Sequence, residues 1–420
     1  MSSEANLRTM STGPAAGGDS SPRRDLRVFL VPAAILAAAF AVRIVSWYVA
    51  NLTTPPLLLP FGTQWNDLYA SYTVWVRALL QGMNPYTSFP FGLTYTYPPG
   101  FIALLVPFFL AGVPQLLLIL TDAGAAVVVF LLARHWASRG VAVACGLAYA
   151  LSPFFVVYEG YTPMSEEPMF FFLILALYLA YDHREIGSAV ALGAALLMKQ
   201  DAFFVLPVFL LAFMNLGLRP RSLLISIGIF AAGSLPALLI SPLGYVANVT
   251  YGLLYPISKV AQGSTVIPIS SSIPQTAFNL YSPGVIPVLI LFSAALLVTE
   301  RRKQNYNAFA AGALGAIILS ALITLGLLDS FSYRFLLVYG FLMAASLDAR
   351  SLAAVTAVAL LAVYLPAGPF QAVLALSAVV AFALVQPDAL GSGKLASGAQ
   401  GVGVVNSFKR TRLSQLLQHA

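Results

Sequence analysis

The sequence predicts an all-α membrane protein with many transmembrane helices, because it is rich in apolar residues, poor in charge and long. Of its 420 residues, 59% are hydrophobic and only 9% are charged, and the mean hydropathy is +0.85. A soluble domain carries about a quarter charged residues, so lipid must solvate much of this chain. The apolar runs predict about 12 transmembrane helices of about 20 residues each.

The basic residues predict the orientation of these helices. Most of the 22 Lys and Arg residues lie in short gaps between apolar runs or in the two tails, and the positive-inside rule puts these parts in the cytoplasm. The other side of the bilayer then holds two long loops, a first long outer loop (51–97) and a second long outer loop (241–284). Orientation explains the net charge of +7, and no nucleic-acid partner is indicated.

The chain divides into four segments by composition. Residues 1–22, rich in Ser, Gly, Pro and Ala, are predicted to be a disordered cytoplasmic N-terminus. Residues 23–347 form the main membrane module with both long outer loops. Residues 348–388 are expected to be C-terminal transmembrane helices, and 389–420 a cytoplasmic tail.

Three apolar runs have unusual lengths. The run 98–133 is too long for one span and short for three, so Gly112-Val-Pro114 is expected to divide it into one crossing and one re-entrant or in-plane piece. The runs 188–198 and 202–215 are too short to cross comfortably, and they meet at Lys199-Gln200-Asp201. Such polar tips between short helices are tolerated where they line a water-filled cavity.

The first long outer loop contains a predicted amphipathic helix. Apolar residues recur at three- and four-residue spacing from Trp65 to Leu80, and the Trp and Tyr residues among them suit the membrane interface. Asp67 lies in the first turn of this helix, where its carboxylate could be an N-cap or could take part in the chemistry of a site. The loop then passes Tyr86 and Tyr97 before the next span.

Charged residues gather on the predicted outer side, which indicates a site. They are the acidic residues Asp67, Glu159, Glu166, Glu167, Asp201 and Asp329 and the basic residues Arg77, Lys199, Lys259 and Arg334. Structural roles remain open for several: Lys199 and Arg334 could snorkel to the interface, Asp201 could pair with Lys199, and Glu166 and Glu167 could favour a helix dipole.

Two further charges lie in apolar stretches. Asp122 could be polar glue between helices, and Arg43 could snorkel or face a cavity. The histidines form no set of metal ligands.

The order of motifs in the first long outer loop resembles that of GT-C glycosyltransferases, above all prokaryotic mannosyltransferases of the mannosyltransferase-87 type. The matching residues are Asp67-Leu-Tyr-Ala-Ser-Tyr72, Trp75, Asn84-Pro-Tyr86 and Tyr97-Pro-Pro99, with Lys199-Gln200 at a hairpin tip and Arg334 at an outer helix start. The resemblance implies a GT-C-type helical bundle and transfer of a hexose, mannose first of all, from a polyprenyl-phosphate donor to a glycolipid or glycan acceptor. It places the catalytic base on Asp67.

This chemistry needs a carboxylate that removes a proton from the acceptor and cations that balance the departing phosphate. Asp67 would supply the first, and Lys199 with Arg334 the second. Substrate contacts are expected from Glu159, Glu166, Glu167, Gln200, Tyr97 and Tyr86. The Gly-Gln-x-Asp element of many relatives is missing, so the glutamate that fills the second acidic role is open. No cofactor is assigned, and a divalent cation is left open. One base without a second nucleophile implies inversion.

Two other classes of protein compete with this hypothesis. A transporter or flippase for a lipid-linked sugar would also use broken helices, but the chain lacks two related halves, and Asp122 is its one candidate for a charge at mid-membrane. A membrane scaffold would not explain two short runs that meet at Lys-Gln-Asp.

Overall fold

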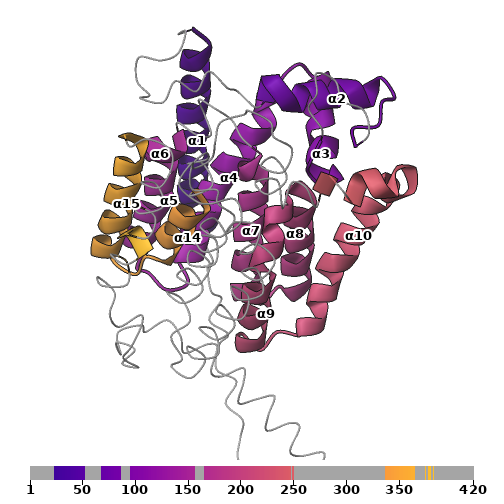
Figure 1. Ribbon diagram of the computed structural model, residues 1–420. Helices are drawn as coiled ribbons and strands as arrows, with labels where there is room; N and C mark the ends of the chain where they lie inside the picture. The colour runs from indigo at the N-terminus through magenta and orange to yellow at the C-terminus, as the bar shows by residue number, and fades with distance from the viewer. Residues whose placement is uncertain are drawn as a thin grey trace, which may run out of the picture.

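The computed structural model describes residues 23–52, 68–86, 95–156, 165–246, 248–249, 336–364, 374, 377–379 and 382. Every regular element in these ranges is a helix, as the sequence predicts (Figure 1). The predicted N-terminal segment, the cytoplasmic tail and most of the second long outer loop lie outside the described residues.

Three helical stretches are long and apolar enough to cross a membrane. They are Phe29–Val49 within α1 (Arg23–Leu52), Gln115–Ala133, which is α4, and Pro220–Ile240, which joins η5 (Pro220–Ser222) to α10 (Leu223–Ile240). The expected first span is therefore confirmed, and the chain is a helical membrane protein. The count of about 12 stays a prediction.

The apolar run 98–133 is divided where the sequence predicts. It forms α3 (Pro99–Leu110) and α4, and a turn between them contains Gly112 at a φ of 76°. That positive φ suits glycine, which has no Cβ to clash. The 12 residues of α3 span about 18 Å, well short of the bilayer core of about 30 Å, so α4 is the one full-length span in this run.

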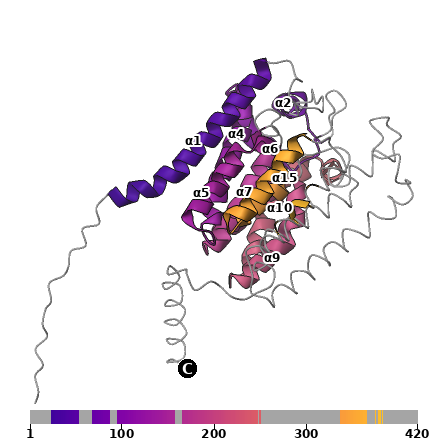
Figure 2. The ribbon, with the colours of Figure 1, turned by 90° about the vertical axis from the view of Figure 1, so that its left-hand side faces the viewer.

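The remaining helices form a bundle around α4 and α7. In chain order they are η1 (Leu68–Tyr72), α2 (Thr73–Leu80), α5 (Arg139–Leu151), α6 (Pro153–Phe155), α7 (Glu166–Tyr181), α8 (Glu185–Met198), η4 (Gln200–Val205), α9 (Leu206–Asn215), α14 (Leu336–Ala345) and α15 (Ala349–Tyr364). Helix α4 contacts α1, α5, α7 and α14, while α8 lies between α7 and α10. Figure 2 shows α1 along one side of this bundle.

The two short apolar runs are confirmed as short helices. Helix α8 begins at Glu185, three residues earlier than predicted, and still has only 14 residues. Lys199 then adopts an extended conformation (φ −155°, ψ 137°). The chain continues as the 3-10 helix η4 and the 10-residue α9. The polar tip at Lys199 is therefore a break in the helical backbone.

The amphipathic helix of the first long outer loop differs from the prediction at its two ends. It lies across one end of the bundle (Figure 1) and begins with a π-helical turn, η1, before α2. Leu68, Tyr72 and Trp75 are buried as expected, whereas Leu79 and Leu80 are exposed. Leu79 and Leu80 are the last two residues of α2, beyond the buried Trp75, Val76 and Ala78.

Small residues and hydroxyl groups pack the helices closely. A Cβ on Gly100 of α3 would lie 2.6 Å from Leu197 Cβ and 2.8 Å from the Leu197 carbonyl oxygen of α8. Ser188 of α8 donates to the Ala176 carbonyl of α7 over 2.7 Å, and Ser226 of α10 donates to the Ala189 carbonyl of α8 over 2.8 Å. Such contacts are typical of helix packing in membranes.

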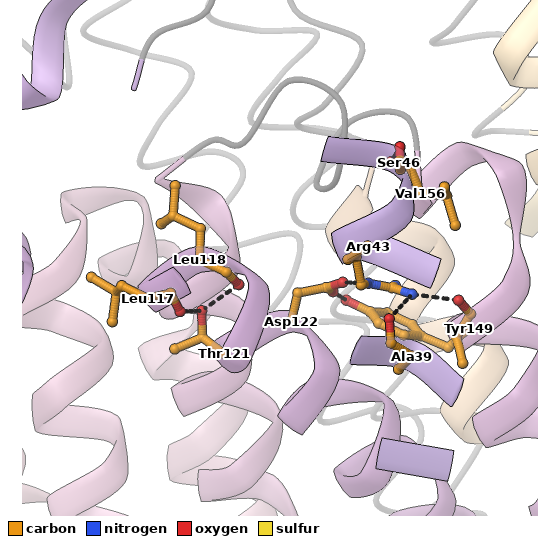
Figure 3. Close-up of polar contacts among 10 residues, drawn as sticks. Ala39, Arg43, Ser46, Leu117, Leu118, Thr121, Asp122, Tyr149 and Val156 are labelled. Carbon is orange, nitrogen blue, oxygen red and sulfur yellow. Dashed lines mark hydrogen bonds and ion pairs between the residues drawn. The ribbon is translucent and has the colours of Figure 1, made fainter. Parts of the chain in front are cut away.

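A buried ionic cluster joins α1, α4 and α5 (Figure 3). Arg43 Nε donates to Asp122 Oδ2, and its Nη1 donates to the Ala150 carbonyl. Tyr149 OH donates to Asp122 Oδ1 over 2.7 Å. Arg43, Asp122 and Tyr149 are each 0% exposed. Arg43 therefore does not snorkel, and Asp122 acts as polar glue between helices.

Loss of the Asp122 charge should destabilise the fold more than loss of the Tyr149 hydroxyl. We expect Asp122→Asn to cost about 3–5 kcal/mol, because Arg43 would keep a buried charge without a carboxylate. Tyr149→Phe should cost about 1–3 kcal/mol, the cost of one buried hydrogen bond. Unfolding in detergent measures both, with exposed Arg139→Met as the control. Equal losses for the first two variants would contradict the role of charge.

Gly100→Ala should loosen the contact of α3 with α8. The new methyl group would meet the Leu197 backbone, so one helix must shift, at a cost of about 1–3 kcal/mol. Gly140→Ala is the matched control, because a Cβ added there would meet no other part of the protein within 4 Å. Thermal unfolding measures the difference, and equal melting temperatures for the two variants would refute the close packing.

Candidate functional site

Four of the predicted site residues are buried where α7 begins and α8 ends. Glu166 and Glu167 form the first turn of α7, and Lys199 and Gln200 follow α8. Their exposed fractions are between 0% and 2%. Charged groups are almost never fully buried without partners, so this concentration marks the position as a candidate site.

An ion pair joins the two segments of the site. Lys199 Nζ donates to Glu166 Oε1, and each side chain is only 2% exposed. Lys199 therefore does not snorkel to the interface. Glu166 lies 33 positions earlier in the sequence. The pairing of Lys199 with Asp201, which the sequence left open, stays a prediction, because the Asp201 side chain lies outside the described residues.

The local backbone explains why both charges are tolerated here. The extended conformation of Lys199 ends α8, and a cation is favourable at the C-terminal end of a helix. Glu166 lies in the first turn of α7, where a carboxylate is favourable. The predicted dipole contact of Glu166 is thus present together with the ion pair.

Tyr97 forms the aromatic side of the site. The Lys199 ammonium lies 5.3 Å from the centre of the Tyr97 ring, within the range of a cation–π contact. The ring meets its neighbours edge to face at centroid distances between 5.8 and 6.2 Å, and these neighbours are Tyr72, Trp75, Tyr95 and Phe101. Tyr97 is therefore held within a layer of aromatic rings.

The buried side chain of Tyr86 holds the backbone of this aromatic layer in place. Its hydroxyl donates to the Tyr97 carbonyl over 3.0 Å, and its side chain is only 4% exposed. Burial raises the pKa of Tyr86 and of Tyr95 above the usual tyrosine value, so both hydroxyls stay protonated and can donate. Tyr95 OH donates to the Pro98 carbonyl over 2.8 Å. The Tyr86 hydroxyl was predicted to contact substrate, but it donates instead to the backbone of the loop, at the Tyr97 carbonyl.

Tyr72 belongs to the site, although the sequence placed it only in the amphipathic helix. Its hydroxyl accepts a hydrogen bond from the Ser165 amide over 3.1 Å, and Ser165 precedes Glu166. This bond fixes the helix of the first long outer loop to the start of α7. The spacing of Tyr72 from Asp67 in the recognised motif was the available signal.

Gln200 presents a buried acceptor. Its Oε1 atom has no hydrogen-bond partner within the described part of the chain. Buried polar atoms are nearly always hydrogen-bonded, so this oxygen is suited to accept a bond from a bound hydroxyl group. In the same ranges, no three His, Cys, Asp or Glu side chains come together as metal ligands.

Asp67, Glu159 and Arg334 lie outside the described residues. The residue after Asp67, Leu68, is buried and begins η1. Helix α14 begins two residues after Arg334 and packs mainly on α4, α15 and α5. It also touches α7, where the rings of Phe341 and Phe170 lie 5.3 Å apart.

These features define the class: a helical membrane protein that encloses a buried acid–cation pair beneath an aromatic layer. No protein family model matches the chain, and no curated protein matches it. Among solved structures, it is similar to the archaeal oligosaccharyltransferase AglB from Archaeoglobus fulgidus, determined with an inhibitory peptide and a dolichol-phosphate. The TM-score is 0.46 and the identity is 14%. The match covers 89% of this chain and 57% of that chain, so this chain spans little more than half the length of AglB.

The Glu166–Lys199 pair should show strong coupling. We expect Lys199→Met and Glu166→Leu each to cost about 3–5 kcal/mol, because each leaves a buried charge alone, while the double variant should lose much less than the sum. The exposed pair Arg184–Asp182, at 2.7 Å, is the control, and Arg184→Met should cost at most about 1 kcal/mol. Denaturant unfolding measures all four variants, and additive losses at Glu166 and Lys199 would contradict the pair.

Proposed function

We propose that this protein is a multi-pass glycosyltransferase of the cell membrane. It transfers a hexose, mannose in the first place, from a polyprenyl-phosphate donor to a glycolipid or glycan acceptor on the extracytoplasmic face, with inversion. The observation that carries the proposal is the buried Lys199–Glu166 pair against Tyr97, next to the helix that begins at the residue after Asp67.

The short helices support a lipid-linked donor. Helix α8 has 14 residues, or about 21 Å, against a bilayer core of about 30 Å. A helix of this length supports a position for Lys199 within the depth of the bilayer, where a lipid-linked donor would carry its phosphate. A soluble nucleotide sugar is confined to the cytoplasm and could not supply a reaction on the outer face.

Lys199 is suited to hold the donor phosphate. An ammonium group carries a full positive charge and N–H donors, which suit the oxygens of a phosphate. At 2% exposure, its charge acts in a low dielectric, where electrostatic stabilisation of a leaving group is strong. We assign Arg334, at the start of the helix that touches α7, to the same phosphate.

The reaction is a single displacement. The acceptor hydroxyl oxygen attacks the anomeric carbon, and the bond from that carbon to the phosphate oxygen breaks, so that the electron pair leaves with polyprenyl phosphate. The Asp67 carboxylate takes the hydroxyl proton. Attack from the face opposite the leaving group inverts the anomeric centre.

The other candidate residues receive roles from their contacts. Glu166 is engaged with Lys199, so we assign the second acidic role to Glu159 or Glu167. The free oxygen of Gln200 would accept a bond from a sugar hydroxyl. Tyr97 forms the wall beside the phosphate, and Tyr86 fixes Tyr97.

The flippase alternative is less well supported. It requires an accessible charge at mid-membrane, for which Asp122 was the candidate. Both carboxylate oxygens of Asp122 accept bonds, from Arg43 and Tyr149, and the side chain is fully buried. Asp122 is thus committed to holding helices together.

Removal of the Asp67 carboxylate should abolish transfer. We expect Asp67→Asn to lower the rate about 10²–10⁴-fold, the usual contribution of a general base, with no loss of thermal stability. Proteoliposomes with labelled polyprenyl-phosphate mannose and extracted glycolipid acceptors provide the assay. Asp182→Asn, at the partly exposed residue that follows the end of α7, is the control and should keep full activity.

Three results would overturn parts of this proposal. Full activity of Asp67→Asn would remove the assignment of the base. Movement of the labelled lipid across the bilayer without any transfer would favour the flippase. Mass spectrometry compares glycolipids and glycoproteins from membranes with and without the protein. The membranes without the protein should contain a product shortened by one hexose, and identical products would reject the transferase.

A further inference from the structure

The two long outer loops are joined by one asparagine side chain. Asn248 follows α10, and its Nδ2 donates to the Tyr86 carbonyl over 2.6 Å and to the Gly244 carbonyl over 2.8 Å. Asn248 and Tyr86 are 162 positions apart in the sequence. Because an amide group has two hydrogens, both donors of Asn248 are in use.

The neighbouring residues fix this junction to the bundle. Tyr245 meets the Tyr86 ring edge to face at 5.1 Å, and its hydroxyl donates to Ser234 Oγ of α10 over 2.7 Å. Tyr245 is only 4% exposed. The chain around Asn248 is therefore a fixed support on α10 to which the first long outer loop is attached.

From Asn248 a continuous series of contacts leads to the candidate site. Asn248 binds the Tyr86 backbone, Tyr86 OH binds the Tyr97 carbonyl, the Tyr97 ring faces Lys199, and Lys199 binds Glu166. Each step joins side chains or backbone groups that are partly or fully buried. Loss of the Asn248 side chain would therefore change the position of the Tyr97 ring.

We infer that Asn248 is a positioning residue, which fastens the first long outer loop to α10 and thereby holds Tyr97 against Lys199. It would not touch the substrate itself. Its effect on catalysis rests on the proposed phosphate-binding role of Lys199, whereas its effect on the loop does not.

The same geometry bears on the sequon Asn248-Val-Thr250. A glycan on Nδ2 would remove one of the two donors and add bulk to a partly buried contact. The sequon therefore stays unmodified in the folded protein, although it lies in the predicted outer loop.

Hydrogen exchange tests the attachment without any enzymatic assay. The Tyr95 amide donates to the Pro85 carbonyl over 3.3 Å, and the Ile102 amide donates to Tyr95 OH over 3.2 Å. In Asn248→Ala we expect these amides to exchange about tenfold faster, as for the loss of one net hydrogen bond. Exposed Val246→Ala and Thr250→Val, which removes the sequon alone, should leave them unchanged.

Tyr86→Phe provides a milder variant, because it keeps the ring and removes only the hydroxyl that binds Tyr97. We expect the KM for the lipid donor to rise about tenfold in Asn248→Ala and in Tyr86→Phe, and little further in the double variant, since both break one series of contacts. A purely structural role would instead lower the melting temperature and leave the KM of the folded protein unchanged.

The outcomes separate the two proposals. Unchanged exchange at Tyr95 and Ile102 in Asn248→Ala, or a glycan on Asn248, would overturn the positioning role. Faster exchange in Asn248→Ala, together with a wild-type protein that transfers no hexose, would confirm the attachment and reject the proposed function.

Discussion

The cost of burying charge governs the arrangement of this protein. An ion removed from water must be paired and hydrogen-bonded, or it destabilises the fold by several kcal/mol. Arg43 with Asp122, and Lys199 with Glu166, meet this requirement inside the bundle. The first pair fastens α1 to α4 and α5, and the second fastens the end of α8 to the start of α7. Stacked rings of Tyr149 and Phe170, 5.7 Å apart, link the two regions, so α7 is fixed from both sides.

The two ionic contacts serve different purposes. Around Asp122, both carboxylate oxygens accept hydrogen bonds, from Arg43 and from Tyr149, among apolar helices, which suits a structural clamp. Around Lys199, a buried oxygen of Gln200 still lacks a donor in the described ranges, and the surrounding elements come from the outer loops and short helices. The proposed binding of a charged, lipid-linked donor uses this polar tip. Its geometry depends on the aromatic layer, which the outer loops assemble.

Much of the helical layout follows from local sequence. The break at Gly112 and the shortness of α8 were predictable, because turn residues and polar residues interrupt apolar runs at these points. The π turn before α2 was not predictable, because the apolar residues there follow the spacing of an ordinary α-helix. The bond from the Ser165 amide to the Tyr72 hydroxyl, across 93 positions, was not predictable either, because it depends on how the first long outer loop meets the start of α7.

By itself, the sequence determined that this is a helical membrane protein, where its runs are interrupted and which few charged residues lie between them, because hydropathy and charge act locally. Only the tertiary structure decided which of these groups meet. Helix packing brings Glu166 to Lys199 across 33 positions. The contact of Asn248 with Tyr86 across 162 positions likewise depends on how α10 lies against the first long outer loop, and a pattern of neighbouring residues does not encode that distance.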